Sequence, residues 1–158
     1  MTEFHDTLKS AYNAALKRLG LSAMTSKQTE MYLLKKGYTQ NVVYQVLDKL
    51  SADGYIDDAS FAANVIRNTL ERNPKSKMML SNELRIKGID DEVLSSAMLL
   101  FNDERQQEMA DRLANKYVKK YMLDDNESIR LKISRALYRK GFEWSVISKA
   151  LKSVNSDD

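Results

Sequence analysis

Apolar residues recur every three to four positions along most of the chain, the spacing that places them on one face of an α-helix. The first such stretch covers residues 4–20. Its apolar face consists of Phe4, Leu8, Tyr12, Ala15, Leu16 and Leu19. No stretch alternates apolar and polar residues for long enough to predict a strand. The pattern therefore predicts an all-α fold.

Turn-forming residues give the ends of the other helices. These are predicted over residues 26–37, 39–54, 56–73, 74–88, 90–101, 104–122, 127–141 and 142–154. We expect each Gly to end a helix in the left-handed conformation, which lets the last carbonyls find hydrogen-bond donors. Pro74, the one proline, is expected in the first turn of its helix. Either Asp57 or Asp58 can cap the helix that follows them.

Three stretches of the chain resemble one another. They are "LLKKGYTQNVVYQVL" (33–47), "LRIKGIDDEVLSSAM" (84–98) and "LYRKGFEWSVISKAL" (137–151). Each has Leu four residues before a Gly, Lys directly before that Gly, and Val five residues after it. The three Gly residues are 51 and 53 positions apart. Such a period predicts three tandem three-helix, helix-turn-helix-like repeats (1–56, 57–103 and 104–158) stacked in an elongated, curved array.

Composition narrows the class of protein. The 158 residues contain no Cys, which excludes disulfides and thiolate metal sites. The N-terminus lacks the apolar run of a signal peptide, and no apolar stretch approaches the ~18 residues of a membrane span. We therefore expect a cytoplasmic protein with no membrane partner. The net charge of +3 is uneven: residues 57–106 carry 7 basic and 9 acidic side chains, whereas residues 107–158 carry 11 and 8.

The repeats differ along one surface-facing stripe of their second helix, at positions two, six and nine residues before the repeat Gly. The first repeat has Lys35, Met31 and Gln28 there, and the second has Ile86, Asn82 and Met79. The third has Arg139, Arg135 and Lys132. These positions share a helix face. A purely structural demand would act on all three copies, so cations in one copy alone favour a binding role.

Further cations surround this stripe in the sequence. The preceding predicted helix carries Arg112, Lys116, Lys119 and Lys120, opposite an apolar stripe that includes Tyr117 and Tyr121. Arg130 and Lys140 lie on the same helix as the stripe. We predict that the two helices pool their cations into a surface for DNA phosphates or for an acidic groove of a protein. A solvated helix face is the competing interpretation.

The sequence does not predict an enzyme. Three pairs, Asp57-Asp58, Asp90-Asp91 and Asp124-Asp125, each precede a predicted helix, where capping explains a carboxylate better than metal binding does. The single His, His5, has no Cys partner for a zinc site. No Gly-rich phosphate loop is present. Tyr12, Tyr117 and Tyr121 are predicted to be core residues, and Trp144 is predicted to pack between helices rather than to stack on bases.

The ordered motifs resemble the RecX family of bacterial recombination regulators, over nearly the whole chain from about residue 15. The middle repeat opens with Tyr55, Ile56, Asp57, Asp58, Phe61 and Ala62, as is typical of that family. The turns Lys87-Gly88-Ile89 and Lys140-Gly141-Phe142 are similar to the family's turns. Family members usually have a Gly with basic neighbours where this chain has "NPKSKMML".

The resemblance implies a function. RecX proteins bind within the helical groove of the filament that RecA recombinase forms on single-stranded DNA, and they bridge neighbouring RecA protomers. A RecX-like negative modulator would inhibit ATP hydrolysis, strand exchange and co-protease activity, and so regulate homologous recombination, DNA repair and the SOS response. It needs no cofactor. We expect a monomer whose partners are the RecA filament and single- or double-stranded DNA.

Two other classes remain open at this stage. The stretch "VVYQVLDKLSADGYI" also looks like the recognition helix of a winged helix-turn-helix transcription regulator. A wing needs two strands after Gly54, whereas residues 57–73 have helical spacing. A generic α-helical scaffold without either target is the third class.

Overall fold

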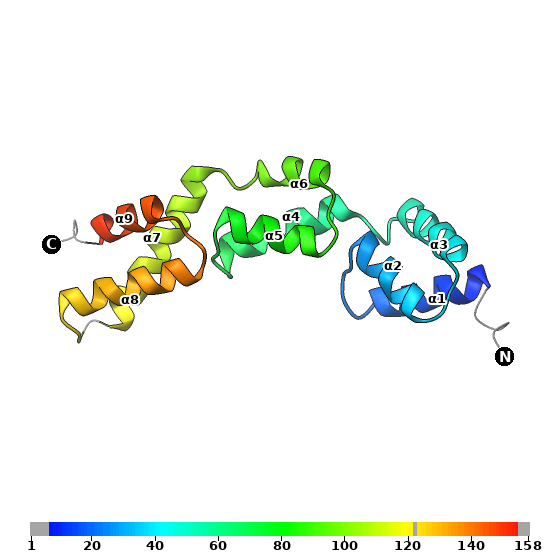
Figure 1. The fold of residues 1–158 in the computed structure, drawn as a ribbon, viewed down its shortest axis with the longest axis horizontal. Coiled ribbons are helices and arrows are strands. Elements are labelled where there is room, and N and C mark those ends of the chain that lie inside the picture. The colour runs from blue at the N-terminus through cyan, green and yellow to red at the C-terminus, as the bar shows by residue number, and fades with distance from the viewer. Residues whose placement is uncertain (1–6, 122, 155–158) are drawn as a thin grey trace. The chain divides into compact units, whose positions relative to one another are not determined.

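A computed structural model describes residues 7–121 and 123–154 of the chain (Figure 1). Within them every regular element is an α-helix. The helices are α1 (Leu8–Leu19), α2 (Ser26–Lys35), α3 (Gln40–Ala52), α4 (Asp58–Glu71), α5 (Lys77–Ile86), α6 (Asp91–Met98), α7 (Asp103–Lys120), α8 (Asn126–Arg139) and α9 (Trp144–Ser153). The predicted all-α class is confirmed. Phe4 and His5 lie outside the described residues.

Polar side chains at the helix N-termini explain where the helices begin. Thr25 accepts a hydrogen bond from the Gln28 N–H, and the Gln28 side chain accepts one from the Thr25 N–H, which forms a capping box before α2. Asp57, rather than Asp58, caps α4, because its carboxylate accepts from the Ser60 N–H at 3.0 Å. Hydrogen bonds from the Ser60 N–H and hydroxyl hold the pKa of Asp57 below its usual value. Side-chain capping thus fixes boundaries that hydrophobic periodicity alone leaves uncertain.

Glycine ends four helical segments in the expected way and one in another. Gly37, Gly54, Gly88 and Gly141 have φ between +77° and +93°. The expectation was wrong for Gly20, whose φ is −65°. Its N–H and that of the next residue bond to the carbonyls of Leu16 and Arg18, so the end of α1 is satisfied without a left-handed residue.

The expectation for Pro74 was also wrong. Helix α5 begins at Lys77, three residues beyond the proline. Ser76 is its N-cap, because the Ser76 hydroxyl accepts from the Met79 N–H at 3.2 Å. Pro74 therefore lies in the link between α4 and α5.

Contacts divide the chain into two compact units. The N-terminal unit comprises the described residues of Met1–Ala63 with Leu84–Leu94, and the C-terminal unit comprises Asn64–Glu83 with the described residues of Ser95–Asp158. Apolar side chains fill the core of the first: Ala11, Ala15, Leu33, Tyr38, Val43, Val46, Leu50 and Ile56. In the second, the largest fully buried side chains include Phe101, Met109, Ile133, Leu137 and Ile147. The three-repeat boundaries at residues 56 and 103 stay a prediction.

The aromatic residues are placed less deeply than their spacing suggested. Tyr12, Tyr117 and Tyr121 are half-buried rather than core residues. Trp144 is 68% exposed, so the predicted packing role was wrong for it. Phe142, which is buried, fills the space between the helices, and Trp144 begins α9 on its outer side. Of the helices described, none is long and apolar enough to cross a membrane.

One ionisable pair joins α1 to the end of α3. The Tyr12 hydroxyl donates to a carboxylate oxygen of Asp53 at 2.6 Å. This bond raises the pKa of Tyr12 to about 12 and lowers the pKa of Asp53. The bond is therefore complete at neutral pH. It is lost as Tyr12 ionises near pH 12, and it is also lost in acid as the pH falls through the lowered pKa of Asp53.

We expect an NMR titration of the tyrosine ring carbons to show Tyr12 ionising at about pH 12. The exchange Asp53→Asn removes the charged acceptor, so Tyr12 should then titrate near the ordinary value of about 10. Identical Tyr12 curves with and without the Asp53 carboxylate would contradict the assignment.

Candidate partner-binding surface

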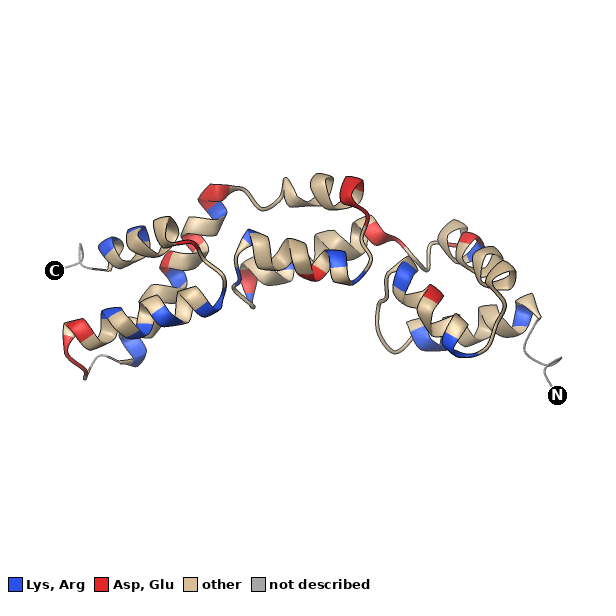
Figure 2. Ribbon diagram, in the orientation of Figure 1, with Lys and Arg blue, Asp and Glu red and all other residues tan. Residues whose placement is uncertain are grey.

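The basic stripe of the third repeat lies along one side of α8. The side chains Ile129, Ile133, Ala136 and Leu137 bury the opposite side of this helix in the C-terminal unit. Arg135 and Arg139 are exposed. Within residues 7–121 and 123–154, no acidic side chain forms an ion pair with either of them. Both guanidinium groups are therefore available to a partner. Figure 2 shows the Lys and Arg positions spaced along α8.

Lys132, the third member of the stripe, is held by the fold. Its ammonium pairs with the carboxylate of Asp124 and lies 4.6 Å from the centre of the Tyr121 ring. The ammonium of Lys120, at the end of α7, lies 5.2 Å from the same ring. Tyr121 thus brings one cation of α7 and one of α8 together. The Asp124 pair partly neutralises Lys132, so Lys132 is a weaker candidate for binding than the two arginines.

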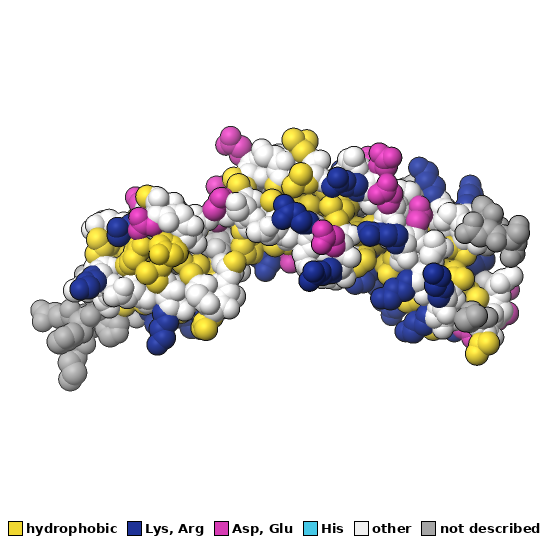
Figure 3. Space-filling model, turned by 180° about the vertical axis from the view of Figure 1, so that it is seen from behind, with side chains coloured by type: hydrophobic (Ala, Val, Ile, Leu, Met, Phe, Trp, Pro, Cys, Tyr) yellow, Lys and Arg dark blue, Asp and Glu magenta, His cyan; other side chains and the backbone are white. Residues whose placement is uncertain are grey.

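The cations of α7 fall into two kinds. Arg112 donates to the carbonyl of Leu70 near the end of α4, a contact that satisfies a helix C-terminus. Lys116 and Lys119 are exposed, and no acidic side chain of the described residues pairs with them. A shallow hollow of about 400 Å³ is lined by Arg112, Asn115, Lys116 and Lys119. In Figure 3, Lys and Arg side chains are dense over the C-terminal unit as seen from behind.

The predicted pooling of all these cations is only partly visible. Lys120 and Lys132 meet at Tyr121, whereas the hollow on α7 includes no residue of α8. Arg130 is half-buried and directs its guanidinium to the Leu151 carbonyl, 3.5 Å away in α9. Lys140 is half-buried in the turn after α8. Arg135 and Arg139 therefore stand out as the most available of the cations on α8.

Known protein families match this chain in three segments, each corresponding to one three-helix domain. Family models described as the first, second and third three-helix domains of RecX match residues 11–50, 57–98 and 103–151. The Regulatory protein RecX of Mycolicibacterium smegmatis is 34% identical over 142 residues, which cover 87% of this chain and 76% of that protein.

The chain belongs to the RecX family.

Other relatives agree with this. The Regulatory protein RecX of Bacillus licheniformis is 31% identical over 99% of this chain, and the chain spans 59% of that protein's length. The crystal structure of RecX from Lactobacillus salivarius has a TM-score of 0.79 at 27% identity, covering 94% of this chain and 96% of that one. A second RecX crystal structure has a TM-score of 0.73 at 27% identity, covering 92% of this chain and 71% of that one.

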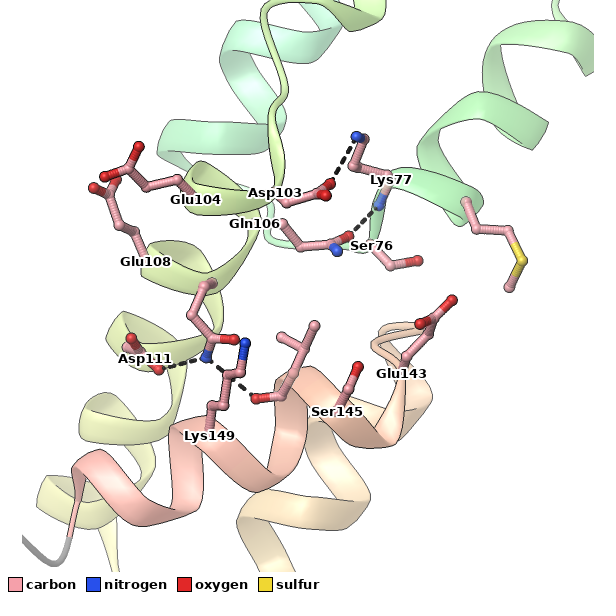
Figure 4. Close-up of a pocket in the computed structure, with 14 residues that line it drawn as sticks. Ser76, Lys77, Asp103, Glu104, Gln106, Glu108, Asp111, Glu143, Ser145 and Lys149 are labelled. Atoms are coloured by element: carbon pink, nitrogen blue, oxygen red, sulfur yellow. Dashed lines mark hydrogen bonds and ion pairs between the residues drawn. The ribbon is translucent and has the colours of Figure 1, made fainter.

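An acidic cavity in this RecX-family chain was not predicted from the sequence. It has a volume of about 770 Å³ and lies among α5, α7 and α9 (Figure 4). Five carboxylates line it: Asp103, Glu104, Glu108, Asp111 and Glu143. Lys77 and Lys149 also line it, and Lys77 pairs with Asp103 at 2.9 Å. Four of these carboxylates lie on α7 and follow one another closely in the sequence, but Glu143, Lys77 and Lys149 come from segments far along the chain, so the sequence does not show that they enclose one cavity.

Two of the three aspartate pairs cap the following helix as expected, through Asp57 at α4 and Asp125 at α8, whereas Asp91 pairs with Arg85. Asp125 caps α8 by accepting from the Ser128 N–H at 2.9 Å. Asp58 accepts from the Ser26 N–H at the start of α2, at 2.8 Å, and Asp124 pairs with Lys132. Among the residues described, no group of three or more His, Asp or Glu side chains is placed to hold a metal ion.

Proposed function

We propose that this RecX-family chain is a negative modulator of the RecA recombinase. It binds the RecA filament on single-stranded DNA and inhibits ATP hydrolysis, strand exchange and co-protease activity, and thereby regulates recombination and DNA repair. The match of all three helical domains to RecX supports this assignment. No cofactor enters the mechanism.

The observation that carries the proposal is the contrast among equivalent helices. At the positions of Arg135 and Arg139, the first repeat has Met31 and Lys35, and the second has Asn82 and Ile86. All six side chains are exposed. The helical scaffold is the same in each repeat, but only α8 offers two unpaired guanidinium groups one turn apart. Guanidinium groups bind carboxylates and phosphates through two parallel hydrogen bonds.

A RecA filament on single-stranded DNA offers both carboxylates and phosphates as acceptors. Contacts of Arg135 and Arg139 with acidic side chains of RecA, or with DNA phosphates, would hold the chain against neighbouring RecA subunits. Subunits bridged in this way cannot complete the rearrangements that accompany ATP hydrolysis. Because the contacts are charge-assisted, binding should weaken as salt is added.

The test is a RecA ATPase assay. The protein is added to RecA, single-stranded DNA and ATP, and hydrolysis is followed together with filament length by electron microscopy. We expect hydrolysis to fall as the protein approaches the RecA concentration. Unchanged hydrolysis at stoichiometric amounts, together with tight sequence-specific binding to duplex DNA, would contradict the proposal and favour a transcription regulator.

The winged-helix alternative has no structural support in the described residues. After Gly54 the chain enters α4 at Asp58, with no strand between them. A wing therefore does not follow α3, and the stretch that looked like a recognition helix packs Val43, Val46 and Leu50 into the core of the N-terminal unit.

A further inference from the structure

The junction between the first and second repeats is made at the N-terminal end of α2. The Thr25 hydroxyl donates to the carbonyl of Lys87, directly before the repeat Gly of the second repeat. The next residue, Ser26, donates its N–H to the Asp58 carboxylate on α4. Thr25 is completely buried by these contacts. The start of the second helix is thus capped by groups from the following repeat.

The junction between the second and third repeats is made at the equivalent positions, with a backbone N–H as donor in place of the Thr25 hydroxyl. The Ser76 N–H donates to the carbonyl of Lys140 at 2.9 Å, and Lys140 again precedes the repeat Gly. The next residue, Lys77, donates its N–H to the Gln106 side chain on α7 at 2.8 Å (Figure 4). Ser76 is buried. A Lys-Gly turn docked on the start of the preceding repeat's second helix is therefore a repeated feature of this fold.

The space around each repeat glycine shows whether its turn packs against another helix. A Cβ on Gly88 would lie 2.2 Å from the Lys27 Cβ, and one on Gly141 would lie 2.6 Å from the Met79 Cγ. No atom of the described residues lies within 4 Å of the corresponding point at Gly37. Gly37 nevertheless has the same left-handed backbone, with φ +93°. Within the described part of the chain, therefore, no other segment packs against the turn at Gly37.

The other end of the chain presents the matching helix start. Asp125 and Asn126 begin α8 as Thr25 and Ser26 begin α2. Both are exposed among the described residues, whereas Thr25 is buried. The equivalent ends of α2 and α5 each bind a Lys-Gly turn in the same structure, so the start of α8 has the form of a binding surface for such a turn.

The two free surfaces carry opposite charges. Lys35 and Lys36 are exposed beside Gly37, and the Lys36 ammonium lies 5.7 Å from the centre of the Tyr32 ring. Asp125 and Glu127 are exposed at the start of α8. Opposite charges favour the encounter of the two surfaces and penalise other pairings.

We propose that copies of this chain associate head to tail, with the Lys36-Gly37 turn of one copy docked on the start of α8 of the next. The Lys36 carbonyl accepts a hydrogen bond from that helix start, as the Lys87 carbonyl accepts from the Thr25 hydroxyl and the Lys140 carbonyl from the Ser76 N–H. Such a contact uses different surfaces on the two copies, so it does not close on itself and successive copies can add. It needs no other protein, it is independent of the proposed action on RecA, and it departs from the monomer expected from the sequence.

The test is sedimentation equilibrium of the purified chain at low salt. We expect the apparent mass to rise above the 18.1 kDa of one chain as concentration increases. A turn variant (Lys35→Glu, Lys36→Glu) and a helix-start variant (Asn126→Lys, Glu127→Lys) should each associate on the order of tenfold more weakly. A control pair on α1 (Lys9→Glu, Lys17→Glu) makes the same change of net charge as the turn variant and should associate normally.

A mixture of the turn variant and the helix-start variant tests the proposed contact most directly. The negative turn of the first variant matches the positive helix start of the second, and the remaining surfaces also match, so a 1:1 mixture should regain association. Circular dichroism of each variant shows that it is folded. A wild-type mass that stays at one chain at every concentration overturns the proposal, and so does a mixture that associates no better than either variant alone.

Discussion

Replacing Gly88 with Ala is expected to destabilise the N-terminal unit by about 2–5 kcal/mol. The left-handed backbone costs a residue with a Cβ roughly 1–2 kcal/mol. Overpacking adds about 1–3 kcal/mol, because the new methyl would lie 2.2 Å from the Lys27 Cβ, which sits close to the backbone of α2 and cannot swing away. The helix itself must therefore move.

The control for this exchange is Gly37→Ala in the same unit. Its φ is also positive, but the added methyl meets no described atom within 4 Å, so a loss of only about 1–2 kcal/mol is expected. Urea unfolding followed by circular dichroism measures both. In addition, combining Lys27→Gly with Gly88→Ala should cost less than the sum of the single losses. Equal losses for the two glycines would show that contact with α2 does not constrain Gly88.

Reversing both arginines of α8 (Arg135→Glu, Arg139→Glu) is expected to weaken binding to a RecA filament about 100-fold. A hydrogen bond to a charged group contributes about 1.5–3 kcal/mol, and two such contacts correspond to at least that factor. If the acceptors are phosphates of single-stranded DNA, the slope of log K against log salt should also become shallower by about 1.4. Fluorescence anisotropy on filaments assembled on labelled DNA measures both quantities.

The matched control reverses two exposed lysines of α1, Lys9→Glu and Lys17→Glu, which changes the net charge equally. Lys132 is left in place because its pair with Asp124 and its contact with Tyr121 stabilise the start of α8, so its loss would confound binding with folding. Equal weakening in the two double variants would indicate a general charge effect. Unchanged binding of the α8 variant would mean that this stripe is solvated surface.

The architecture of each repeat was predictable from local sequence. Leu33, Leu84 and Leu137, four residues before the repeat glycines, are all fully buried. Gly37, Gly88 and Gly141 all adopt the left-handed conformation that ends a helix. These features follow from helical periodicity and from backbone sterics, which depend on residues within one or two turns of each other. The same ordered motifs carried the resemblance to RecX that the family models confirm.

Predictions from local sequence were wrong at three positions, where other groups nearby ended the helix, capped it or filled the core. Gly20 remains right-handed because nearby carbonyls already accept the available N–H groups. Pro74 lies outside α5 because Ser76 caps that helix. Trp144 is exposed because Phe142 occupies the space between the helices. At Pro74 and at Trp144 two residues competed for one role, and spacing alone does not rank them.

The sequence by itself determined the helices, the repeat and the family, because these depend on periodicity and on motifs contained in short stretches of chain. Only the tertiary structure decided which equivalent positions differ in their surroundings. It buries the turn at Gly88 against Lys27 and leaves that at Gly37 open, and it pairs Lys132 while leaving Arg135 free. The contact of Gly88 with Lys27 joins residues 61 positions apart, and the pair of Lys132 with Asp124 joins two sides of the turn before α8; both form only when the chain packs.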